Sequence, residues 1–390
     1  MSQLKRMLAV SCTATIAFLI GCGGNVDLGG KGAGASANDD TSTTTDSNPP
    51  VGTSVLKLPG VTLEDLVVAG DHLYFTAYGA KTPGLYRCNK QRCEATLKLL
   101  VKGWFGFPQV VGDRLGVSRF NEQTAGNFEL MTFALPDASA PQVVVSDLPG
   151  LQPTPGLFTK DFVYFALLMD RTIYRCAQPD CAAGPEQLAP NPALDSVKLE
   201  ADSGRLLWTD GSFIYRAGDD GVAPAEILQP DEQLSAAPPR TLNPEYPVDG
   251  VDSIAVHDGM LYASVARSQT GRGCDSTCPH EIVGWPVEGG PIQVFFKSDT
   301  RLSNVAIVDG ELMWFRPLTA VSDAATMSTC RVEACEATYR ELGQVRSEDG
   351  VFAAGEQDVY WVEARAAYMG ESFTGFHAEE IRRSPRLPKP

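Results

Sequence analysis

Short apolar runs separated by polar turns recur along most of the chain. Residues 205–216 give the clearest example, because the apolar runs 206–208 and 213–215 flank a turn that contains Asp210 and Gly211. Two β-prone runs joined by a Gly-containing turn predict a β-hairpin. Seven runs of the first kind occur at spacings of about 42 to 54 residues, at 72–75, 114–117, 162–165, 205–208, 260–262, 311–314 and 358–361.

Each of these runs is one of four predicted strands in a repeating unit. A short apolar strand precedes the run, as at 66–69, 253–256 and 304–307, and a third strand follows it, as at 84–87, 172–175 and 213–216. A fourth strand closes the unit, as at 95–101, 142–146 and 292–296. Units of this length are typical of propeller blades, so the pattern predicts an all-β fold, a seven-bladed β-propeller of four-stranded antiparallel blades.

The ends of the repeat region predict how the ring closes. The seventh unit offers three strands, the last around 380–383, whereas residues 54–58 form a stray strand ahead of the first unit. We expect this N-terminal strand to complete the last blade, since closure removes the exposed sheet edge. Two separate β-domains are the alternative, but they explain neither the spacing nor the stray strand. The propeller is expected over residues 54–385, with a Pro-rich tail at 386–390.

The first 22 residues predict export. Lys5 and Arg6 precede an apolar stretch at 7–20, which is short for a transmembrane helix and fits a secretory signal. It ends in Leu-Ile-Gly-Cys at 19–22, which resembles the lipobox of bacterial lipoproteins. The resemblance implies removal of residues 1–21 as a signal peptide and lipid attachment at Cys22. It also implies a membrane-anchored lipoprotein, with Gly23 favouring the outer membrane. An ordinary signal peptide is the alternative.

Composition and charge narrow the classes of partner. Residues 22–53 contain no aromatic side chain and are rich in Gly, Ser, Thr and Asp, so we expect a disordered tether behind the lipidated cysteine. The formal net charge of −16 argues against nucleic acid, because phosphate contacts need clustered Lys and Arg. The expected partners are the membrane, through the lipid anchor, and a protein or a glycan.

The fourth unit resembles known propellers. Its residues 207–210, Leu-Trp-Thr-Asp, and more weakly Tyr-Trp-Val-Glu at 360–363, resemble the YWTD repeat of low-density-lipoprotein-receptor-type propellers. Related repeats occur in TolB-like propellers and in other bacterial lipoprotein propellers. YWTD domains typically have six blades, and one repeat in seven carries the near-complete motif here. The resemblance therefore implies a propeller fold without transferring a receptor function, and we expect Trp208 and Tyr215 to serve blade packing.

Eight cysteines in the predicted propeller form four local pairs. An even number in an exported protein predicts disulfides, which would join Cys88 to Cys93, Cys176 to Cys181, Cys274 to Cys278, and Cys330 to Cys335. Three of the pairs follow a third strand, which would place their thiols opposite each other across an outer hairpin. Zinc is the alternative, but zinc sites need convergent groups of four ligands, whereas these pairs belong to different blades. We expect no metal and no cofactor.

The candidate binding face carries the second-to-third-strand loops and the connections between blades. Its long segments at 229–249, 267–280, 317–327 and 365–377 belong to units four to seven. Long loops on a rigid scaffold are where function is usually found. The candidate binding residues are aromatic: Trp104, Phe105, Tyr246, Tyr368, Phe373 and Phe376. Local packing of these side chains is the alternative.

The sequence offers little for catalysis. It has four histidines and lacks a nucleophile elbow, a metalloprotease helix or a phosphate loop, so no catalytic residue is predicted. Glu200 and Asp252 lie on or near first strands, where paired carboxylates could cleave a glycoside. Our first hypothesis is a binding module that holds its ligand on the loop-rich face of blades 4–7. A polysaccharide hydrolase or lyase and a structural envelope protein are the alternatives.

Overall fold

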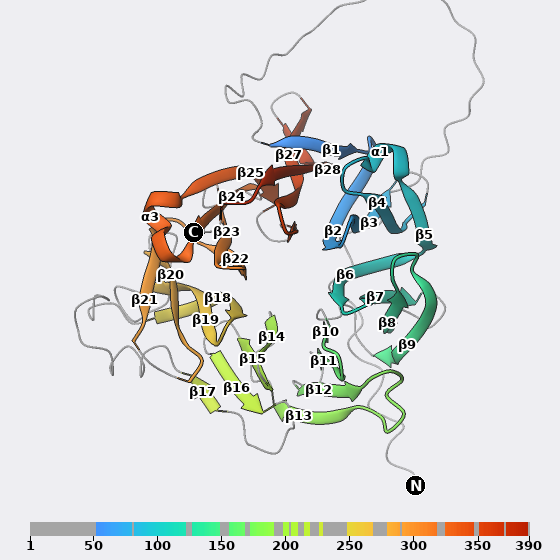
Figure 1. Cartoon of the computed structure of the whole chain (residues 1–390), viewed down its shortest axis with the longest axis horizontal. Coiled ribbons are helices and arrows are strands. Elements are labelled where there is room, and N and C mark those ends of the chain that lie inside the picture. The colour runs from blue at the N-terminus through green and yellow to red at the C-terminus, as the bar shows by residue number, and fades with distance from the viewer. Residues whose placement is uncertain are drawn as a thin grey trace, which may run out of the picture. The chain divides into compact units, whose positions relative to one another are not determined.

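The strands form a ring of seven four-stranded antiparallel sheets within the part of the chain that the structure describes (Figure 1). The computed structural model describes residues 52–79, 82–121, 127–148, 156–167, 172–190, 198–202, 204–209, 214–218, 226–228, 248–267, 279–288, 291–317, 324–346, 351–369 and 372–388. Each sheet is one propeller blade, and the predicted seven-bladed β-propeller is confirmed.

The first four blades follow one another along the chain. Blade 1 has β2 (Val61–Ala69), β3 (His72–Gly79), β4 (Gly84–Asn89), the short helix α1 (Cys93–Thr96) and β5 (Lys98–Lys102). Blade 2 has β6 (Trp104–Val111), β7 (Arg114–Asn121), β8 (Asn127–Ala134) and β9 (Ser139–Leu148). Blade 3 has β10 (Leu157–Phe158), β11 (Phe162–Leu167), β12 (Thr172–Ala177) and β13 (Glu186–Pro190). Blade 4 has β14 (Lys198–Asp202), β15 (Arg205–Thr209), β16 (Ile214–Gly218) and β17 (Glu226–Leu228).

The remaining blades include the one that closes the ring. Blade 5 has β18 (Val248–His257), β19 (Met260–Arg267), β20 (His280–Pro286) and β21 (Gln293–Ser298). Blade 6 has β22 (Ser303–Val308), β23 (Glu311–Pro317), β24 (Ala324–Arg331), the helices η2 (Val332–Ala334) and α3 (Cys335–Thr338), and β25 (Arg340–Arg346). Blade 7 has β26 (Phe352–Ala354), β27 (Asp358–Met369), β28 (Ser372–Pro385) and, from the N-terminal end, β1 (Thr53–Lys57).

The predicted closure by the N-terminal strand is confirmed. β1 pairs antiparallel with β28, so the first described strand is the outermost strand of the last blade. Leu56 of β1 is buried in a cluster that also contains Phe75 of blade 1 and Tyr360 of blade 7. The closing strand therefore contributes apolar contacts as well as backbone hydrogen bonds.

The core consists of apolar layers between neighbouring blades. Among the described residues, each of the seven blade-to-blade contacts contains one cluster of buried side chains. Within three blades a second-strand aromatic residue stacks on its registered third-strand partner, as Trp208 does on Tyr215 at 5.3 Å between ring centroids. Trp208 is fully buried and Tyr215 nearly so, which agrees with a packing role for both.

Two faces of the ring carry different connections. We call the face with the first-to-second and third-to-fourth strand turns the hairpin face. Two of its first-to-second turns are the two-residue turns Asp258-Gly259 and Asp309-Gly310. All four residues have positive φ, as a type I′ turn requires. We call the opposite face, with the second-to-third strand connections and the connections between blades, the loop face.

The C-terminal segment crosses the hairpin face from blade 7 to blade 6. Arg386 donates hydrogen bonds from Nε to Glu311 Oε2 at 2.9 Å and from Nη1 to Asp309 Oδ2 at 3.0 Å. Arg331 in turn donates to the carbonyl oxygens of Leu387 and Pro388. Glu311 is fully buried, so Arg386 supplies the opposite charge that a buried carboxylate needs. The residues that follow the last strand, which ends at Pro385, therefore also pack on the ring.

The segment 365–377 differs from the expected long loop. β27 and β28 continue through it as a paired hairpin, with Arg365 opposite His377 and Tyr368 opposite Phe373. Aromatic residues favour extended strands, and their presence here accounts for the extension of the hairpin. This segment therefore projects as regular β-structure on the loop face.

Candidate functional site

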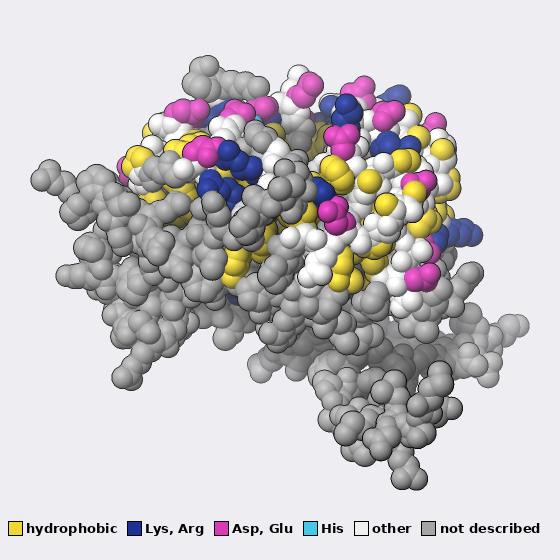
Figure 2. Space-filling view, turned by 90° about the horizontal axis from the view of Figure 1, so that it is seen from below, with side chains coloured by type: hydrophobic (Ala, Val, Ile, Leu, Met, Phe, Trp, Pro, Cys, Tyr) yellow, Lys and Arg dark blue, Asp and Glu magenta, His cyan; other side chains and the backbone are white. Residues whose placement is uncertain are grey.

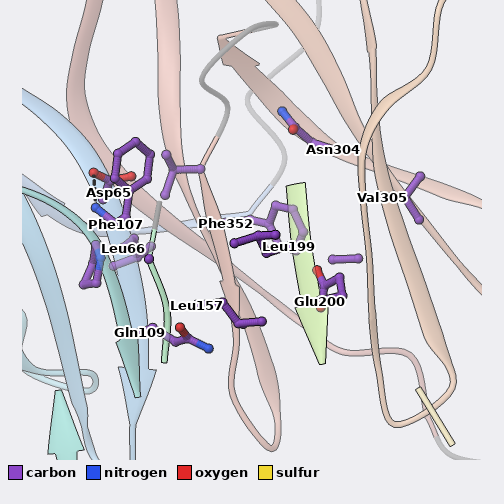
Figure 3. Close-up of a pocket in the computed structure, with 14 residues that line it drawn as sticks. Asp65, Leu66, Phe107, Gln109, Leu157, Leu199, Glu200, Asn304, Val305 and Phe352 are labelled. Carbon is purple, nitrogen blue, oxygen red and sulfur yellow. Dashed lines mark hydrogen bonds between the residues drawn. The ribbon is translucent and has the colours of Figure 1, made fainter. Parts of the chain in front are cut away.

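A cavity of about 450 Å³ occupies the centre of the ring (Figure 3). First strands from blades 1, 2, 3, 4, 6 and 7 contribute its walls. The lining residues are Asp65, Leu66, Phe107, Pro108, Gln109, Gly156, Leu157, Leu199, Glu200, Asn304, Val305, Ala306, Val351 and Phe352. The volume lies within the range of about 300–1,000 Å³ that is usual for ligand sites, and the mostly apolar lining with a few polar groups is also typical of them.

β-Bulges and positive φ angles change the direction of several of these side chains. The β2–β3 pairing shifts register between Leu63 and Leu66, which leaves Asp65 in a β-bulge at the cavity wall. The β6 and β22 strands shift register in the same way, and Phe107 (φ 53°) and Asn304 (φ 51°) take positive φ there. Positive φ is uncommon outside glycine and costs conformational energy. Bulges beside a cavity commonly direct side chains toward a ligand site.

Asp65 joins blade 1 to blade 2 at the cavity wall. Its Oδ2 accepts a hydrogen bond from Phe107 N at 3.0 Å, and Thr76 Oγ1 donates to the same oxygen at 3.4 Å. A similar link joins blades 5 and 6, where Ser253 Oγ accepts from Val305 N at 2.8 Å. Side chains of the inner strands therefore hold neighbouring blades in register and at the same time shape the cavity.

The first strand of blade 2 presents two exposed aromatic side chains. Trp104 is 44% exposed, and its ring stacks on Tyr78 with 4.7 Å between centroids. Tyr78 Oη donates to the carbonyl oxygen of Phe105, and burial, followed by the charges of Glu64 and Asp65, raises the pKa of Tyr78. Phe107 is 41% exposed and lines the cavity.

Phe105 is not part of this exposed surface, in contrast to our expectation. It is 1% exposed and packs in the cluster between blades 1 and 2, with an edge-to-face contact to Phe133. Successive strand residues point to opposite sides, so Trp104 and Phe105 could not share one face. Trp104 is thus the candidate of this pair that the structure places at the surface.

The other aromatic candidates are only partly described. Tyr246 lies outside the described residues. The backbone positions of Tyr368, Phe373 and Phe376 lie in the β27–β28 hairpin, but their side chains lie outside what the structure describes. The lipid-attachment candidate Cys22 and the expected tether also lie outside the described residues.

The structure separates the two carboxylates considered for glycoside cleavage. Glu200 of β14 lines the cavity (Figure 3). Asp252 of β18 is absent from the cavity's lining residues and instead accepts a hydrogen bond from Arg301 Nε at 3.0 Å. Asp65, which the sequence analysis missed, lines the cavity together with Glu200. The sequence feature that marks Asp65 is the Glu-Asp pair at 64–65, which interrupts a mostly apolar first strand. This pair alone does not predict a bulge.

Three of the four expected disulfides lie in the described structure. They join Cys88 to Cys93, Cys176 to Cys181, and Cys330 to Cys335, with Cα–Cα distances of 4.7 to 5.0 Å. Cys274 and Cys278 lie outside the described residues.

The second cysteine of each bonded pair precedes the fourth strand, a correction to the expected cross-strand position. Cys93 and Cys335 each begin a helical turn of sequence Cys-Glu-Ala-Thr, α1 and α3. In both turns the threonine hydroxyl accepts from the backbone N–H of the residue after the first cysteine of the pair, Asn89 or Arg331, and so fixes the turn. The sequence Cys-Glu-Ala-Thr occurs twice in the chain. We did not predict a helical turn there, because the fourth strand of the first unit was expected to begin at residue 95.

A histidine beside the loop face is buried without contributing to the cavity. His280 is 6% exposed, and burial lowers its pKa, with the charges of Asp252 and Arg301 acting in opposite directions. The described residues contain no group of three or more His, Cys, Asp or Glu side chains able to hold a metal ion. In that same part of the chain, no helix has the length and apolarity needed to cross a membrane.

One side of the outer wall carries a mixture of charged and apolar side chains. Figure 2 shows the ring from the side, and on the coloured surface acidic and basic side chains are interspersed among apolar ones. Exposed ion pairs of the ring, such as Lys98 with Asp137, contribute little to stability. We take the central cavity and its mouth as the candidate site, because the cavity has the volume and the mostly apolar lining of a ligand site.

Comparison with known proteins supports the fold and gives no family. No family model matches the chain, and no curated protein matches it. Among solved structures, it is similar to the β-propeller domain of the Trilobed protease from Pyrococcus furiosus, with 8% identity and a TM-score of 0.51 over 77% of this chain and 90% of that one. That domain is described as having an open velcro topology, whereas β1 closes the ring here.

Two further solved structures are similar at the same level. The AfRom2 CNH domain has 10% identity and a TM-score of 0.51, over 87% of this chain and 99% of that one. An acylaminoacyl peptidase has 9% identity and a TM-score of 0.51, over 83% of this chain and 52% of the peptidase. Identities this low show a shared β-propeller fold alone, because one fold hosts many unrelated functions.

Proposed function

We propose that the protein is a lipid-anchored, extracytoplasmic β-propeller that binds a partner protein on its loop face, at the mouth of the central cavity. One observation carries the proposal. Of the three large hydrophobic side chains that are exposed among the described residues, Trp104, Phe107 and Val143, two lie on β6 beside this mouth. Aromatic side chains are enriched at protein interfaces and dominate their binding energy.

The lipobox-like sequence and the disulfides both support a location outside the cytoplasm. Residues 19–22 resemble a lipobox, which would anchor the protein through Cys22. Three disulfides in small loops are expected of proteins in oxidising compartments and are rare in the cytosol. A lipid anchor and a binding surface on a rigid ring together favour a module that recruits or holds a partner near a membrane.

The arrangement of the cavity favours binding over catalysis. Retaining and inverting glycosidases need two carboxylates placed about a single bond. Of the carboxylates considered from the sequence, Glu200 reaches the cavity and Asp252 pairs with Arg301 instead. Asp65 also lines the cavity, and its Oδ2 accepts hydrogen bonds that link blades 1 and 2. Because hydrogen bonds between neighbouring blades fix the inner strands, the ring can present a rigid surface to a partner.

The proposal is tested by affinity purification from native membranes after mild cross-linking. We expect one or a few proteins to co-purify with the wild type, and the variant Trp104→Ala/Phe107→Ala to lose them. Val143→Ala, which alters an exposed residue on β9, serves as the matched control and should keep them. A glycan array run in parallel decides between ligand classes, and glycan binding without any co-purified protein would contradict the proposal.

A further inference from the structure

The charge of the cavity points to the chemistry of its ligand. Its described lining residues include two carboxylates, Asp65 and Glu200, and no Lys, Arg or His. The whole chain carries a formal net charge of −16, so its long-range field adds to the local one. A cavity with low-dielectric walls and charges of one sign concentrates ligands of the opposite sign.

Asp65 is held in a fixed position at this wall. The hydrogen bonds from Phe107 N and Thr76 Oγ1 both end on Oδ2 and orient the carboxylate. A Cβ atom added to Gly106 would lie 3.5 Å from the same oxygen, so the absence of a side chain there leaves room beside the carboxylate. Arg119, a basic residue of the neighbouring strand, pairs with Glu129.

Two exposed aromatic residues lie on β6, the strand that is hydrogen-bonded to this carboxylate. Phe107 follows Gly106 directly and is exposed toward the cavity, while Trp104 lies three residues toward the loop face on the same strand. Tyr78 supports one side of the Trp104 indole, which stays 44% exposed. The faces of aromatic rings attract ammonium and guanidinium groups, and tryptophan attracts them best. A carboxylate bonded to the backbone of Phe107, with two exposed rings on the same strand, combines ion pairing with this attraction.

The span of the site selects the kind of cation. Trp104 and Phe107 are three positions apart on β6, a distance of roughly 10 Å at the rise of a strand. A small ammonium ion would contact only one end of this span. An arginine or lysine side chain on an extended segment can reach Asp65 with its charged group while the neighbouring residues lie against Trp104 at the mouth.

We propose that the mouth of the cavity between blades 1 and 2 binds a basic side chain, arginine or lysine, from an extended segment of the partner. Asp65 accepts hydrogen bonds from the charged group, Phe107 and Trp104 cover it, and Glu200 adds negative charge across the cavity. This inference rests on the proposed function, since it specifies what the partner presents to the same surface.

A pair of matched peptides tests the inference without knowledge of the partner. The probes are a dye-labelled pentapeptide with leucines flanking a central arginine, and the same peptide with citrulline, which keeps the shape and lacks the charge. Fluorescence anisotropy with the full propeller should show saturable binding of the arginine peptide and at least tenfold weaker binding of the citrulline peptide. Equal binding of the two peptides, or no binding of either, would overturn the inference.

Matched variants locate the site. Asp65→Asn keeps an oxygen that can accept from Phe107 N and should weaken binding of the arginine peptide about tenfold. Glu64→Gln removes the same charge from the adjacent, exposed residue and should change the affinity less than twofold. Trp104→Ala removes no side-chain hydrogen bond, so we expect the variant to fold. It should weaken binding of the arginine peptide about three- to fivefold. An unchanged affinity in folded Asp65→Asn and Trp104→Ala would place the peptide elsewhere.

The two proposals fail in different ways. If membrane purification yields a partner that depends on Trp104 and Phe107 while the arginine peptide does not bind, the proposed function stands and the basic side chain is excluded. If the peptide binds but no partner is found in membranes, the chemistry of the site stands and the proposed function does not.

Discussion

Burial separates two tryptophans that look alike in the sequence. Trp208 is fully buried between blades 3 and 4, where it stacks on Tyr215. Trp104 stacks on a tyrosine too, yet remains 44% exposed at the start of β6. The first contact holds a blade together, whereas the second leaves a surface available to a partner.

The same substitution should therefore have opposite effects at these two positions. Trp208→Ala should lower the free energy of unfolding by about 3–5 kcal/mol, since it removes a large side chain from a packed layer. Trp104→Ala should lower it by about 1 kcal/mol or less and affect partner binding instead. Urea denaturation of both variants measures the difference. A larger loss of stability in Trp104→Ala would show that this residue serves the core.

Alkaline titration should reveal a buried tyrosine. Burial, followed by the charge of Asp358, raises the pKa of Tyr360 to about 12. Below the ordinary pKa of about 10, both states keep the proton and this contribution to stability is complete. Between pH 10 and 12 the unfolded chain loses the proton while the folded chain keeps it, so the free energy of unfolding falls.

Unfolding at several pH values measures this fall. Tyr360→Phe should lose less stability than the wild type between pH 10 and 12, because one of the tyrosines with a raised pKa has been removed. Below about pH 9 the two proteins should show the same pH dependence, and this range serves as the control. Parallel pH dependences for Tyr360→Phe and the wild type would contradict the assignment.

The elements of the ring were predictable where their pattern is regular. The seven second strands and the N-terminal closing strand follow from apolar runs and their spacing, because strand alternation and ring closure constrain them strongly. The helical turns α1 and α3 and the hairpin at 365–377 did not follow. A single helical turn has no periodicity to detect, and an extension of two strands beyond the blade resembles a loop when its cross-strand partners are unknown.

Candidate site residues were harder to predict than strands. Trp104 was foreseen as an exposed aromatic residue, but Phe105 was grouped with it even though alternation sends it to the core. Asp65 reaches the cavity only because of a bulge, and one carboxylate in a strand does not reveal the register shift that exposes it. Asp65 and Glu200 are 135 positions apart in the sequence, and they converge only because the ring closes, which no local pattern encodes.

The C-terminal strap is an element whose removal should destabilise the ring. We define it as residues 385–388, held by the bonds of Arg386 to Glu311 and Asp309. Arg386→Ala should lower the free energy of unfolding by about 3 kcal/mol, because it removes the closer of the two arginines that pair with the buried Glu311 carboxylate and leaves only Arg340, at 3.7 Å. Urea denaturation measures the loss. Arg386→Met combined with Glu311→Leu should recover much of it, since neither charge then remains buried.

At the scale of the whole molecule, the ring depends on contact between its two ends. β1 supplies the outer strand of blade 7, and its Leu56 fills the layer between blades 7 and 1. Without β1, strand β28 would present an unpaired edge, and unpaired edges favour association with other chains.

Truncation tests this closure. A variant lacking residues 1–58 should form oligomers or aggregates and melt at a lower temperature than one lacking residues 1–51, which keeps β1. Size-exclusion chromatography with light scattering and thermal melting measure both effects. Equal mass distributions and equal melting temperatures for the two variants would show that blade 7 does not need the N-terminal strand.

The central claim is that a protein partner sits at the mouth of the cavity. The most direct measurement is photo-cross-linking in intact cells with benzoylphenylalanine placed at position 107, on the cavity wall, or at position 143, on outer strand β9. Both positions are exposed in the described structure, which makes the pair comparable. We expect a discrete protein adduct from position 107 and none of the same mass from position 143. The same adduct from both positions, or an adduct from position 143 alone, would contradict the claim.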